Sequence, residues 1–275
     1  MVSLRAGGPA QFFAEPTDAE RVLALQRWAE VDGIVWTCLG GGTNLLFADS
    51  ACPGLVIRTT GLRGVSFDGT QVTAAAGERV ADVARLACER GLSGLEWACG
   101  IPGTVGGAIV MNAGTREGET VDRLVAATYV DGSDRIRRSA GELDLAYRRS
   151  GFLDGTIRGI LIEGSFELAE STHDRTLAEA QRILDERRRK FPGGATAGCT
   201  FRNPPDGPTA GELLDRAGCK GLRVGGARVS EIHANFIVND GTENAAEILA
   251  LIESMKRRVK EAFGVDLVEE IVVRR

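Results

Sequence analysis

Residues 91–114 read GLSGLEWACGIPGTVGGAIVMNAG, a long and almost uncharged segment that is rich in glycine and contains Pro102 and Asn112. Its part GIPGTVGGAIVMNAG (100–114) has too much glycine for a packed helix, so we expect a loop whose backbone turns sharply or approaches a ligand closely. Backbone of this kind is typical of a surface that covers something flat or phosphorylated. The segment therefore predicts a nucleotide or cofactor site.

A second glycine segment lies earlier in the chain, where VWTCLGGGTNLLF (35–47) follows a predicted strand. Its backbone N–H groups could form an anion-binding nest, with the side chains of Thr43 and Asn44 as added donors. The segment lacks the G-x-G-x-x-G of a Rossmann fold, and no Lys-Ser/Thr pair follows as in a Walker loop. A plain tight turn would explain it equally well, but two such segments in one half of the chain favour a large nucleotide cofactor.

The composition is that of a globular protein of two or three domains. The chain has 275 residues, 43% of them hydrophobic and 26% charged, with a net charge of −5. This charge gives no basic field for nucleic acid, and no apolar run reaches the roughly 20 residues that span a bilayer. The N-terminus lacks the features of a signal peptide. We therefore expect a cytoplasmic protein without nucleic-acid or membrane partners.

The cysteine pattern argues against metal and disulfide chemistry. The six cysteines form no C-x-x-C pair, and the chain has only two histidines, so we expect no metal site. Disulfides are rare in a reducing cytoplasm. Most of the cysteines, Cys88 above all, should be small buried residues. For Cys199 in AGCTFRNP (197–204), a buried filler and a proton-donating acid both remain open.

Hydrophobic periodicity and turn signals predict an α+β fold with several hairpins. Two Thr-x-x-Glu patterns, at Thr17 and Thr209, indicate capping boxes that begin helices, and Asp-Gly pairs at 68–69 and 131–132 indicate hairpin turns. The predicted helices cover 17–29, 78–91, 177–190, a segment from 209 and 242–263; the predicted strands cover 33–39, 55–59, 159–168, 234–239 and 265–275; the predicted hairpins cover 65–77 and 123–138.

Five segments together resemble the UDP-N-acetylenolpyruvoylglucosamine reductase (MurB) family. They occur in the order and at the approximate spacing of that family: GGGTNLL (40–46), GLEWACGIPGTVGGAIVMNAG (94–114), YRRS (147–150), AGCTFRNP (197–204) and GGARVSEIHANFIVN (225–239). The resemblance implies a vanillyl-alcohol-oxidase/PCMH-type FAD-binding fold in two subdomains, with a smaller α+β substrate-binding domain. The expected boundaries are 1–60 and 61–170 for the FAD-binding subdomains and 171–263 for the substrate-binding domain, with 264–275 returning to the FAD-binding part.

The resemblance also implies an activity. The enzyme would use NADPH and non-covalent FAD to reduce enolpyruvyl-UDP-GlcNAc to UDP-N-acetylmuramate, a UDP-N-acetylmuramate dehydrogenase reaction of peptidoglycan synthesis. It would thereby serve cell wall biogenesis, cell shape and cell division. The chain has no tyrosine after Tyr147, and so resembles the shorter class that lacks a tyrosine-bearing insertion. Its partner is then a nucleotide-sugar substrate, and we expect a monomer or a weak oligomer.

Three catalytic residues follow from the resemblance. Hydride addition builds negative charge that a cation must stabilise and a proton donor must quench. Arg148 matches the cation, although a surface arginine would look the same, and Glu270 matches the C-terminal glutamate, with Glu269 as the alternative register. Cys199 stands where the family commonly has serine. A thiol is the stronger acid, and we expect it to donate the proton, the alternative being an inert thiol beside Thr200 or a water.

The binding residues are carried over in the same way. His233 could equally be a structural histidine, and Arg188 and Arg189 are expected on a solvated helix face. For the substrate the resemblance implies Arg187, Lys190, Asn203 and His233. For FAD it implies Gly40, Gly41, Gly42, Thr43, Asn44, Gly100, Gly103, Thr104, Gly106, Gly107, Ala108 and Asn112.

Two other classes of protein remain. One is a different flavin oxidase or dehydrogenase of the same fold, in which Cys38 or Cys99 could tether the flavin covalently; retention of flavin after acid denaturation would favour it. The other is a non-catalytic nucleotide-binding protein, for which a colourless preparation would argue.

Overall fold

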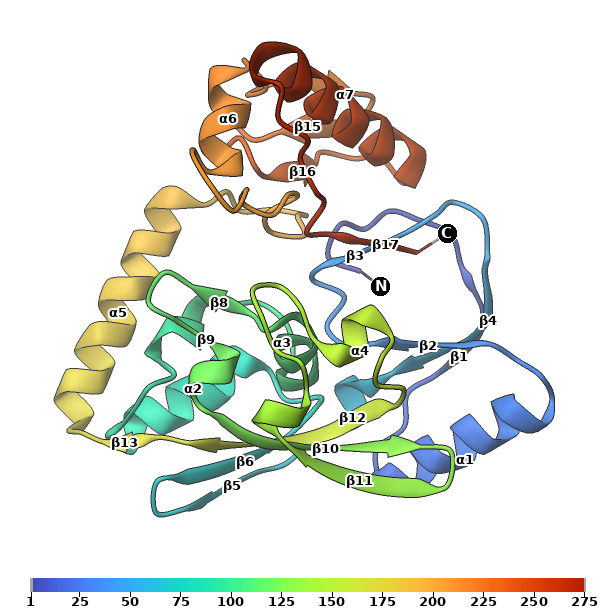
Figure 1. The fold of residues 1–275 in the computed structure, drawn as a ribbon, viewed down its shortest axis with the longest axis vertical. Helices are drawn as coiled ribbons and strands as arrows, with labels where there is room; N and C mark the ends of the chain where they lie inside the picture. Colours follow the sequence, from blue (N-terminus) through green and yellow to red (C-terminus); the bar gives the residue numbers. More distant parts are fainter. Residues whose placement is uncertain (1, 275) are drawn as a thin grey trace. The chain divides into compact units, whose positions relative to one another are not determined.

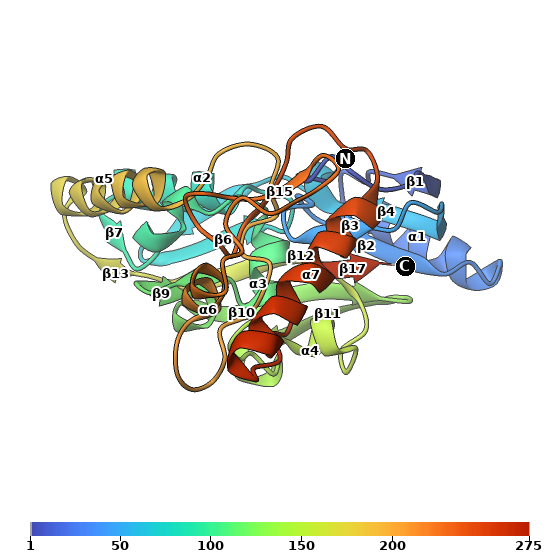
Figure 2. The same cartoon turned by 90° about the horizontal axis from the view of Figure 1, so that it is seen from above.

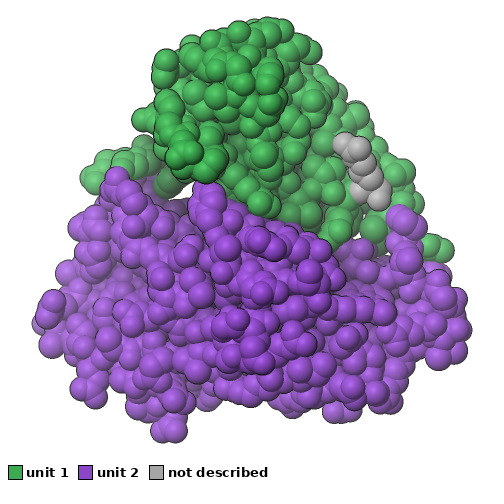
Figure 3. Space-filling view, in the orientation of Figure 1, with its two compact units in different colours: residues 1–11, 42–52, 188–275 green, residues 12–41, 53–187 purple. Residues whose placement is uncertain are grey.

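The structure is a computed structural model, and it describes residues 2–274. The chain divides into two compact units, which Figure 3 distinguishes by colour. Unit 1 comprises residues 1–11, 42–52 and 188–275, and unit 2 comprises residues 12–41 and 53–187. Each unit is therefore built from segments that lie far apart in the sequence.

The centre of unit 2 is a five-stranded antiparallel sheet in the order β11-β10-β12-β6-β5. Both predicted hairpins are confirmed: their turns contain Gly69 and Gly132 with φ of +57° and +59°, a left-handed conformation that glycine adopts without strain. The strands are β5 (Val65–Asp68), β6 (Gln71–Ala75), β10 (Leu124–Asp131), β11 (Asp134–Ser139) and β12 (Ile160–Glu167).

Helices cover this sheet. The helix α3 (Val105–Met111) packs against β12 and β6, and α1 (Ala19–Val31) packs against β10 (Figure 1). The predicted cap of α1 is wrong by one residue, because Asp18 rather than Thr17 is the N-cap and accepts a hydrogen bond from the Arg21 N–H at 2.9 Å. The remaining helices are α2 (Val80–Glu89), α4 (Gly151–Asp154) and α5 (His173–Lys190), which begins four residues earlier than predicted.

Shorter elements complete this part of the chain. A second sheet has the order β1-β4-β2, in which β2 and β4 run parallel. Its strands are β1 (Ala10–Ala14), β2 (Trp36–Leu39) and β4 (Cys52–Arg58). Two-residue strands pair as β7 (Leu92–Ser93) with β13 (Ala169–Glu170) and β8 (Gly114–Thr115) with β9 (Gly118–Glu119). Single 3₁₀ turns cover Thr59–Gly61, Glu96–Gly100, Thr120–Asp122 and Ala140–Glu142.

The prediction that residues 100–114 form a loop without a packed helix is wrong. Residues Val105–Met111 form α3, whose N-cap Thr104 accepts a hydrogen bond from the Gly107 N–H at 3.3 Å. Val105 and Ile109 are fully buried. Tertiary packing and the cap outweigh the roughly 1 kcal/mol of helix propensity that each glycine costs relative to alanine.

Unit 1 contains a three-stranded antiparallel sheet in the order β14-β15-β16 with two helices. The longer helix α7 (Ala245–Phe263) packs on the shorter helix and on the hairpin β14–β15 (Figures 1 and 2). The predicted capping box of Thr209 and Glu212 is confirmed at the start of α6 (Ala210–Arg216). The strands are β14 (Arg223–Val224), β15 (Ala227–Val229) and β16 (Ile237–Asn239).

The last described strand pairs with a strand from the first fifty residues of the chain. The last strand, β17 (Val272–Arg274), pairs in parallel with β3 (Leu45–Phe47). It is shorter than the predicted strand 265–275, whose residues 268–271 instead pair irregularly with residues 200–202. Within residues 2–274, no helix has the length and apolar character needed to cross a membrane.

Candidate active site

The two glycine segments predicted to hold a cofactor lie against each other within unit 2. A Cβ placed on Gly40 would come 2.7 Å from Oγ1 of Thr104 and 3.9 Å from the backbone nitrogen of Gly107. The first distance is too short for any side chain, so the backbone at Gly40 needs glycine. The prediction that both segments serve one site is therefore consistent with their contact at this point.

Glycine is also needed inside α3. A Cβ on Gly106 would lie 3.0 Å from Cβ of Ala76 and 3.2 Å from its carbonyl oxygen, whereas a Cβ on Gly107 would meet only Oγ1 of Thr104 at 3.5 Å. Gly106 thus lets the helix pack on the chain after β6. Gly107 has no such packing requirement, so its lack of a side chain leaves space on the exposed side of the first turn.

The end of α3 is joined to the loop that carries Arg148. Asn112 is fully buried in a left-handed conformation with φ of +40°. Its Nδ2 donates to the Ala146 carbonyl at 3.1 Å, and its Oδ1 accepts from the Val121 N–H at 2.9 Å. The amide of Asn112 therefore organises the protein itself, and contact with a cofactor stays a prediction for this residue.

Arg148 is held in place by backbone carbonyls. Its guanidinium donates to the carbonyls of Asn112 at 3.2 Å and Gly114 at 2.7 Å, and it lies over the ring of Tyr147. The side chain is half-buried, which separates it from its exposed neighbour Arg149. The guanidinium therefore has a defined direction, which a solvated surface arginine lacks.

The backbone at Arg148 is strained. Ala146 and Arg149 exchange both backbone hydrogen bonds, at 3.1 and 3.0 Å, and so close a tight turn around Tyr147 and Arg148. In this turn Arg148 has φ of +52°, a conformation that favours glycine. A left-handed conformation costs a residue with a Cβ about 1–2 kcal/mol, and such strain is concentrated at functional sites.

Within unit 1, Cys199 lies on a segment clamped by Asn235. The side chain of Asn235 accepts from the Phe201 N–H at 2.9 Å and donates to the Phe201 carbonyl at 2.8 Å, and its own carbonyl accepts from the Thr200 N–H at 2.8 Å. Cys199 itself pairs with Phe236 and is half-buried. All six cysteines are free thiols. Cys88 is buried as predicted, but the prediction that most of the cysteines are buried is wrong, because only Cys88 and Cys219 are buried, whereas Cys38 is exposed and the other three are half-buried.

The segment that contains Glu270 is hydrogen-bonded to the segment that contains Cys199. The Glu270 N–H donates to the Thr200 carbonyl at 2.8 Å, and Phe201 lies directly opposite Glu269. The carboxylate of Glu269 binds Nζ of Lys256 at 3.0 Å. The Glu269 carboxylate is therefore engaged in this ion pair, and the chain bends at Glu270 and Ile271.

The neighbouring polar residues of this segment lie around the start of α6. Oδ1 of Asn203 accepts from the Ala210 N–H at 3.1 Å. Among residues 2–274, the buried Nε of Arg202 has no hydrogen-bond partner. A buried donor without a partner is costly, so Arg202 is suited to an anionic ligand. The prediction from sequence missed Arg202, although a cation beside Asn203 in AGCTFRNP was a usable signal.

His233 lies in an aromatic cluster of unit 1. Its ring stacks on Phe191 at 5.4 Å between centroids and meets Phe236 edge-on at 5.0 Å. Its Nδ1 accepts from the Asn235 N–H at 3.2 Å. Burial, followed by the charge of Lys220, lowers the pKa of His233 from its usual value. His233 is therefore a neutral, packed ring that supports the clamp residue Asn235.

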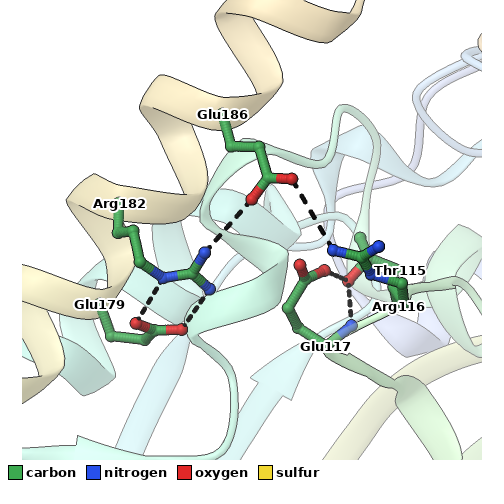
Figure 4. Close-up of polar contacts among 6 residues, drawn as sticks. All are labelled: Thr115, Arg116, Glu117, Glu179, Arg182 and Glu186. Atoms are coloured by element: carbon green, nitrogen blue, oxygen red, sulfur yellow. Dashed lines mark hydrogen bonds and ion pairs between the residues drawn. The ribbon is translucent and has the colours of Figure 1, made fainter.

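The basic helix α5 is neutralised along one side. Arg182 binds Glu179 at 2.6 Å and Glu186 at 3.2 Å. Glu186 also lies 3.9 Å from Arg116, on the turn between β8 and β9 (Figure 4). In the same turn Thr115 donates a hydrogen bond to Glu117. One turn further along α5, Nε of Arg187 donates to the Gly100 carbonyl at 3.1 Å. Arg187 thus lies at the glycine segment 91–114, while Arg188, Arg189 and Lys190 are exposed.

The predicted site residues are therefore gathered within each unit. In unit 2 the structure brings together Gly40, Thr104, Gly107, Asn112 and Arg148, with Arg187 at Gly100. In unit 1 it joins the segments of Cys199, Asn203 and Glu270, and Asn44 contacts the Glu270 backbone at 3.0 Å. The part of the chain that the structure describes holds no cluster of three or more His, Cys, Asp or Glu side chains suited to a metal ion.

Comparisons with known proteins agree with these features. A model of the UDP-N-acetylenolpyruvoylglucosamine reductase C-terminal domain matches residues 190–274, and a model of an FAD binding domain matches residues 10–140. The UDP-N-acetylenolpyruvoylglucosamine reductase of Chloroflexus aggregans is 40% identical over 98% of this chain and 93% of its own length.

Solved structures give the same result. The crystal structure of the reductase (MurB) from Thermus caldophilus superposes with a TM-score of 0.85 at 36% identity, covering 100% of this chain and 96% of that one. Phl p 4.0202, a glucose dehydrogenase, shares the fold alone, with a TM-score of 0.51 at 13% identity over 61% of this chain and 36% of its own. The expected FAD-binding fold is confirmed, and the chain belongs to the UDP-N-acetylenolpyruvoylglucosamine reductase family of FAD-binding oxidoreductases.

Proposed function

We propose that this chain reduces enolpyruvyl-UDP-GlcNAc to UDP-N-acetylmuramate with NADPH as reductant, and so serves peptidoglycan synthesis. The proposal assigns FAD binding to residues 1–170 and substrate binding to residues 171–263. The pairing of β17 with β3 supports the return of the C-terminal strand to the FAD-binding part. Family membership supports the substrate, and the hydrogen bond from Glu270 to Thr200, which links two of the proposed catalytic segments, is the observation that carries the mechanism.

The glycine segments fit a bound dinucleotide. The contact of Gly40 with Thr104 leaves no room for a side chain there, and the first turn of α3 presents Gly107 without one. Backbone N–H groups in such a place suit a pyrophosphate. A bound FAD would supply the hydride transfer from NADPH to the enolpyruvyl group. We propose that it binds non-covalently at the residues predicted above.

Arg148 would stabilise the charge that hydride addition creates. As the hydride adds to one carbon of the enol ether, negative charge spreads from its neighbour to the attached carboxylate. A guanidinium already oriented by two carbonyls requires little reorganisation to stabilise that charge. The strain in the turn at Arg148 supports a functional reason for this residue.

Cys199 would complete the reduction by protonation. Its Sγ–H gives a proton to the carbon that carries the negative charge, and the resulting thiolate is reprotonated from solvent. Glu270 would orient or protonate the same group from the neighbouring segment. The clamp by Asn235 supports this role for Cys199, because it fixes the backbone on which the thiol is carried.

The substrate would be held by the end of α5 and by residues of unit 1. Arg187 and Lys190 suit its diphosphate, and Asn203 and His233 suit its sugar and nucleotide parts. Arg202 joins this proposed set because its buried Nε has no partner within residues 2–274. As a planar, permanently charged donor group, it suits a phosphate oxygen.

One assay tests the function. The purified protein is expected to be yellow, to release its flavin on acid denaturation, and to oxidise NADPH rapidly only when enolpyruvyl-UDP-GlcNAc is present. Flavin that stays with the denatured protein would indicate another oxidase of this fold. A colourless protein that does not bind added FAD would contradict the proposal.

Separated half-reactions test the proton donor. With Cys199→Ala we expect normal bleaching of FAD by NADPH, and reoxidation by the UDP substrate slowed about 10²–10⁴-fold through loss of acid catalysis. Cys199→Ser is expected to retain much of the activity. The half-buried Cys52 provides a control, and Cys52→Ala should leave both half-reactions unchanged. Normal reoxidation of the Cys199→Ala variant would exclude the thiol as donor.

A further inference from the structure

We infer that the side chain of Asn44 positions Glu270, and that Asn44 takes part in the predicted FAD-binding glycine segment through its backbone alone. This inference rests on the proposed role of Glu270. Nδ2 of Asn44 donates to the Glu270 carbonyl at 3.0 Å, and the Asn44 carbonyl accepts from the Val272 N–H at 3.0 Å. One residue thus binds the chain on both sides of Ile271.

The backbone of Glu270 is held at both of its peptide groups. Its N–H donates to the Thr200 carbonyl at 2.8 Å, on the segment that carries Cys199. Its carbonyl is held by Asn44, on the segment that ends the glycine run 40–42. Fixing both groups fixes the direction in which the Glu270 side chain leaves the backbone. Asn44 therefore links the cofactor segment to the proposed acid–base pair.

The position of Asn44 in the sheet explains why an amide is needed. The first residue pair of the parallel ladder between β3 and β17 is Leu45 with Val272. Asn44 therefore lies opposite Ile271, one residue before this ladder begins. The chain turns at residues 43 and 44, and β3 starts only at Leu45. At this end the side-chain amide of Asn44 reaches the Glu270 carbonyl and so continues the ladder beyond the strand. Alanine cannot donate this bond, and neither can an ionised aspartate, whose side chain only accepts.

A positioning role and a cofactor-binding role have different consequences. Loss of a cofactor contact would lower FAD content and disturb both half-reactions. Loss of the bond to Glu270 would affect only the half-reaction that uses Glu270. Because a displacement of about 1 Å in a catalytic group can cost about 10²-fold in rate, the expected effect is measurable.

The test is a double-mutant cycle between Asn44→Ala and Glu270→Gln. We expect Asn44→Ala to be reduced by NADPH at near the wild-type rate and reoxidised by enolpyruvyl-UDP-GlcNAc about 10–100-fold more slowly. In the Glu270→Gln background it should add less than about twofold, since coupled residues are not additive. Asn44→Asp, which keeps the size and the backbone bonds, should behave as Asn44→Ala does.

A second measurement does not depend on activity. In the apoprotein of Asn44→Ala, amide hydrogen exchange in residues 268–274 is expected to be faster than in the wild type, with the exchange of α7 unchanged. Equal slowing of both half-reactions, effects that multiply in the double variant, or unchanged exchange would each overturn the inference. If Glu270→Gln alone reoxidises normally, the proposed role of Glu270 fails instead.

Discussion

Arg148 shows at the scale of one residue how a strained backbone and an oriented cation go together. The turn at residues 146–149 would suit glycine at position 148, yet an arginine stands there with φ of +52°. Its two bonds to the carbonyls of Asn112 and Gly114 offset the strain, because each bond has a charged donor. The same bonds aim the guanidinium, which is what stabilisation of developing charge requires.

Truncation of Arg148 is therefore expected to affect activity far more than folding. We expect Arg148→Ala to lower the rate of reoxidation by the UDP substrate about 10²–10³-fold, as loss of one charge-stabilising group does in other enzymes. The neighbour Arg149 is exposed and ion-paired with Asp154, so Arg149→Ala should change the rate less than about twofold. Stopped-flow flavin absorbance measures both; similar rates for the two variants would place Arg148 among ordinary surface arginines.

His233 predicts a dependence of stability on pH. Burial lowers its pKa in the folded protein, while in the unfolded chain it takes up a proton below about pH 6.5. Its contribution is therefore fully present above that pH and is lost as the pH falls toward the folded pKa. We expect His233→Gln to flatten the loss of unfolding free energy between about pH 7 and pH 5, measured with urea.

The other histidine of the chain is a matched control for this effect. His173 is exposed at the start of α5, and His173→Gln removes a histidine without removing a buried ring. The comparison uses the slope of unfolding free energy against pH and not its absolute value, because His233→Gln also loses ring stacking and so is less stable at every pH. A wild-type slope in His233→Gln would show that another group carries the pH dependence.

Local sequence allowed individual site residues to be named, but not the residues that hold them. Cys199 and Glu270 are named through short motifs that resemble the MurB family, and their catalytic roles stay predictions. The clamping roles of Asn235 and Asn112 could not be predicted in this way. Asn235 binds Phe201 and Asn112 binds Ala146, and in each pair the two residues are more than 30 positions apart in the sequence. A buried amide selects its partners only when the fold brings distant backbone groups to it.

At the scale of one element, α3 shows where glycine content misleads. The propensity of VGGAIVM is poor, which led to the prediction of a loop. The helix forms because Thr104 caps it and because Val105 and Ile109 are buried against the sheet. The hairpins, by contrast, were predicted correctly because Asp-Gly turns determine their conformation locally.

The two glycines of α3 are expected to respond differently to alanine. Gly106→Ala places a Cβ 3.0 Å from Ala76, and overpacking of about 1–3 kcal/mol exceeds the gain of about 1 kcal/mol in helix propensity. Gly107→Ala meets only Thr104 at 3.5 Å, so the apoprotein should be as stable as the wild type or up to about 1 kcal/mol more stable.

Thermal unfolding of the apoproteins and FAD titration test this pair. We expect Gly106→Ala to lower Tm by several degrees, at roughly 2–4 °C per kcal/mol. Gly107→Ala should keep or slightly raise its Tm and yet bind FAD more weakly, because the proposed cofactor lies on that side of the turn. Equal destabilisation by both substitutions would contradict the packing argument, and unchanged FAD affinity in Gly107→Ala would contradict the proposed cofactor contact.

At the scale of the whole molecule, unit 1 depends on segments that a continuous domain boundary omits. The family model of the C-terminal domain matches residues 190–274, but β17 of that region pairs with β3. Asp49 accepts from the N–H groups of Ala245 and Ala246, at 2.5 and 2.9 Å, and so caps α7 from outside the region. Nδ2 of Asn239 binds the Leu4 carbonyl at 2.7 Å.

A fragment of residues 188–275 is therefore expected not to fold by itself. It would leave the edge of β17 unpaired, and loss of the Asp49 cap alone would cost about 1 kcal/mol or more of helix stability. A region of this size has little stability to spare, since small domains are only marginally stable. We expect broad, poorly dispersed amide resonances and no cooperative thermal transition.

The same fragment with residues 42–52 joined through a flexible linker regains β3, Asn44 and Asp49, and should recover cooperative unfolding by circular dichroism. Cooperative unfolding of residues 188–275 alone would show that β14–β16, α6 and α7 suffice, and that β3 serves the active site without being needed for the fold of unit 1.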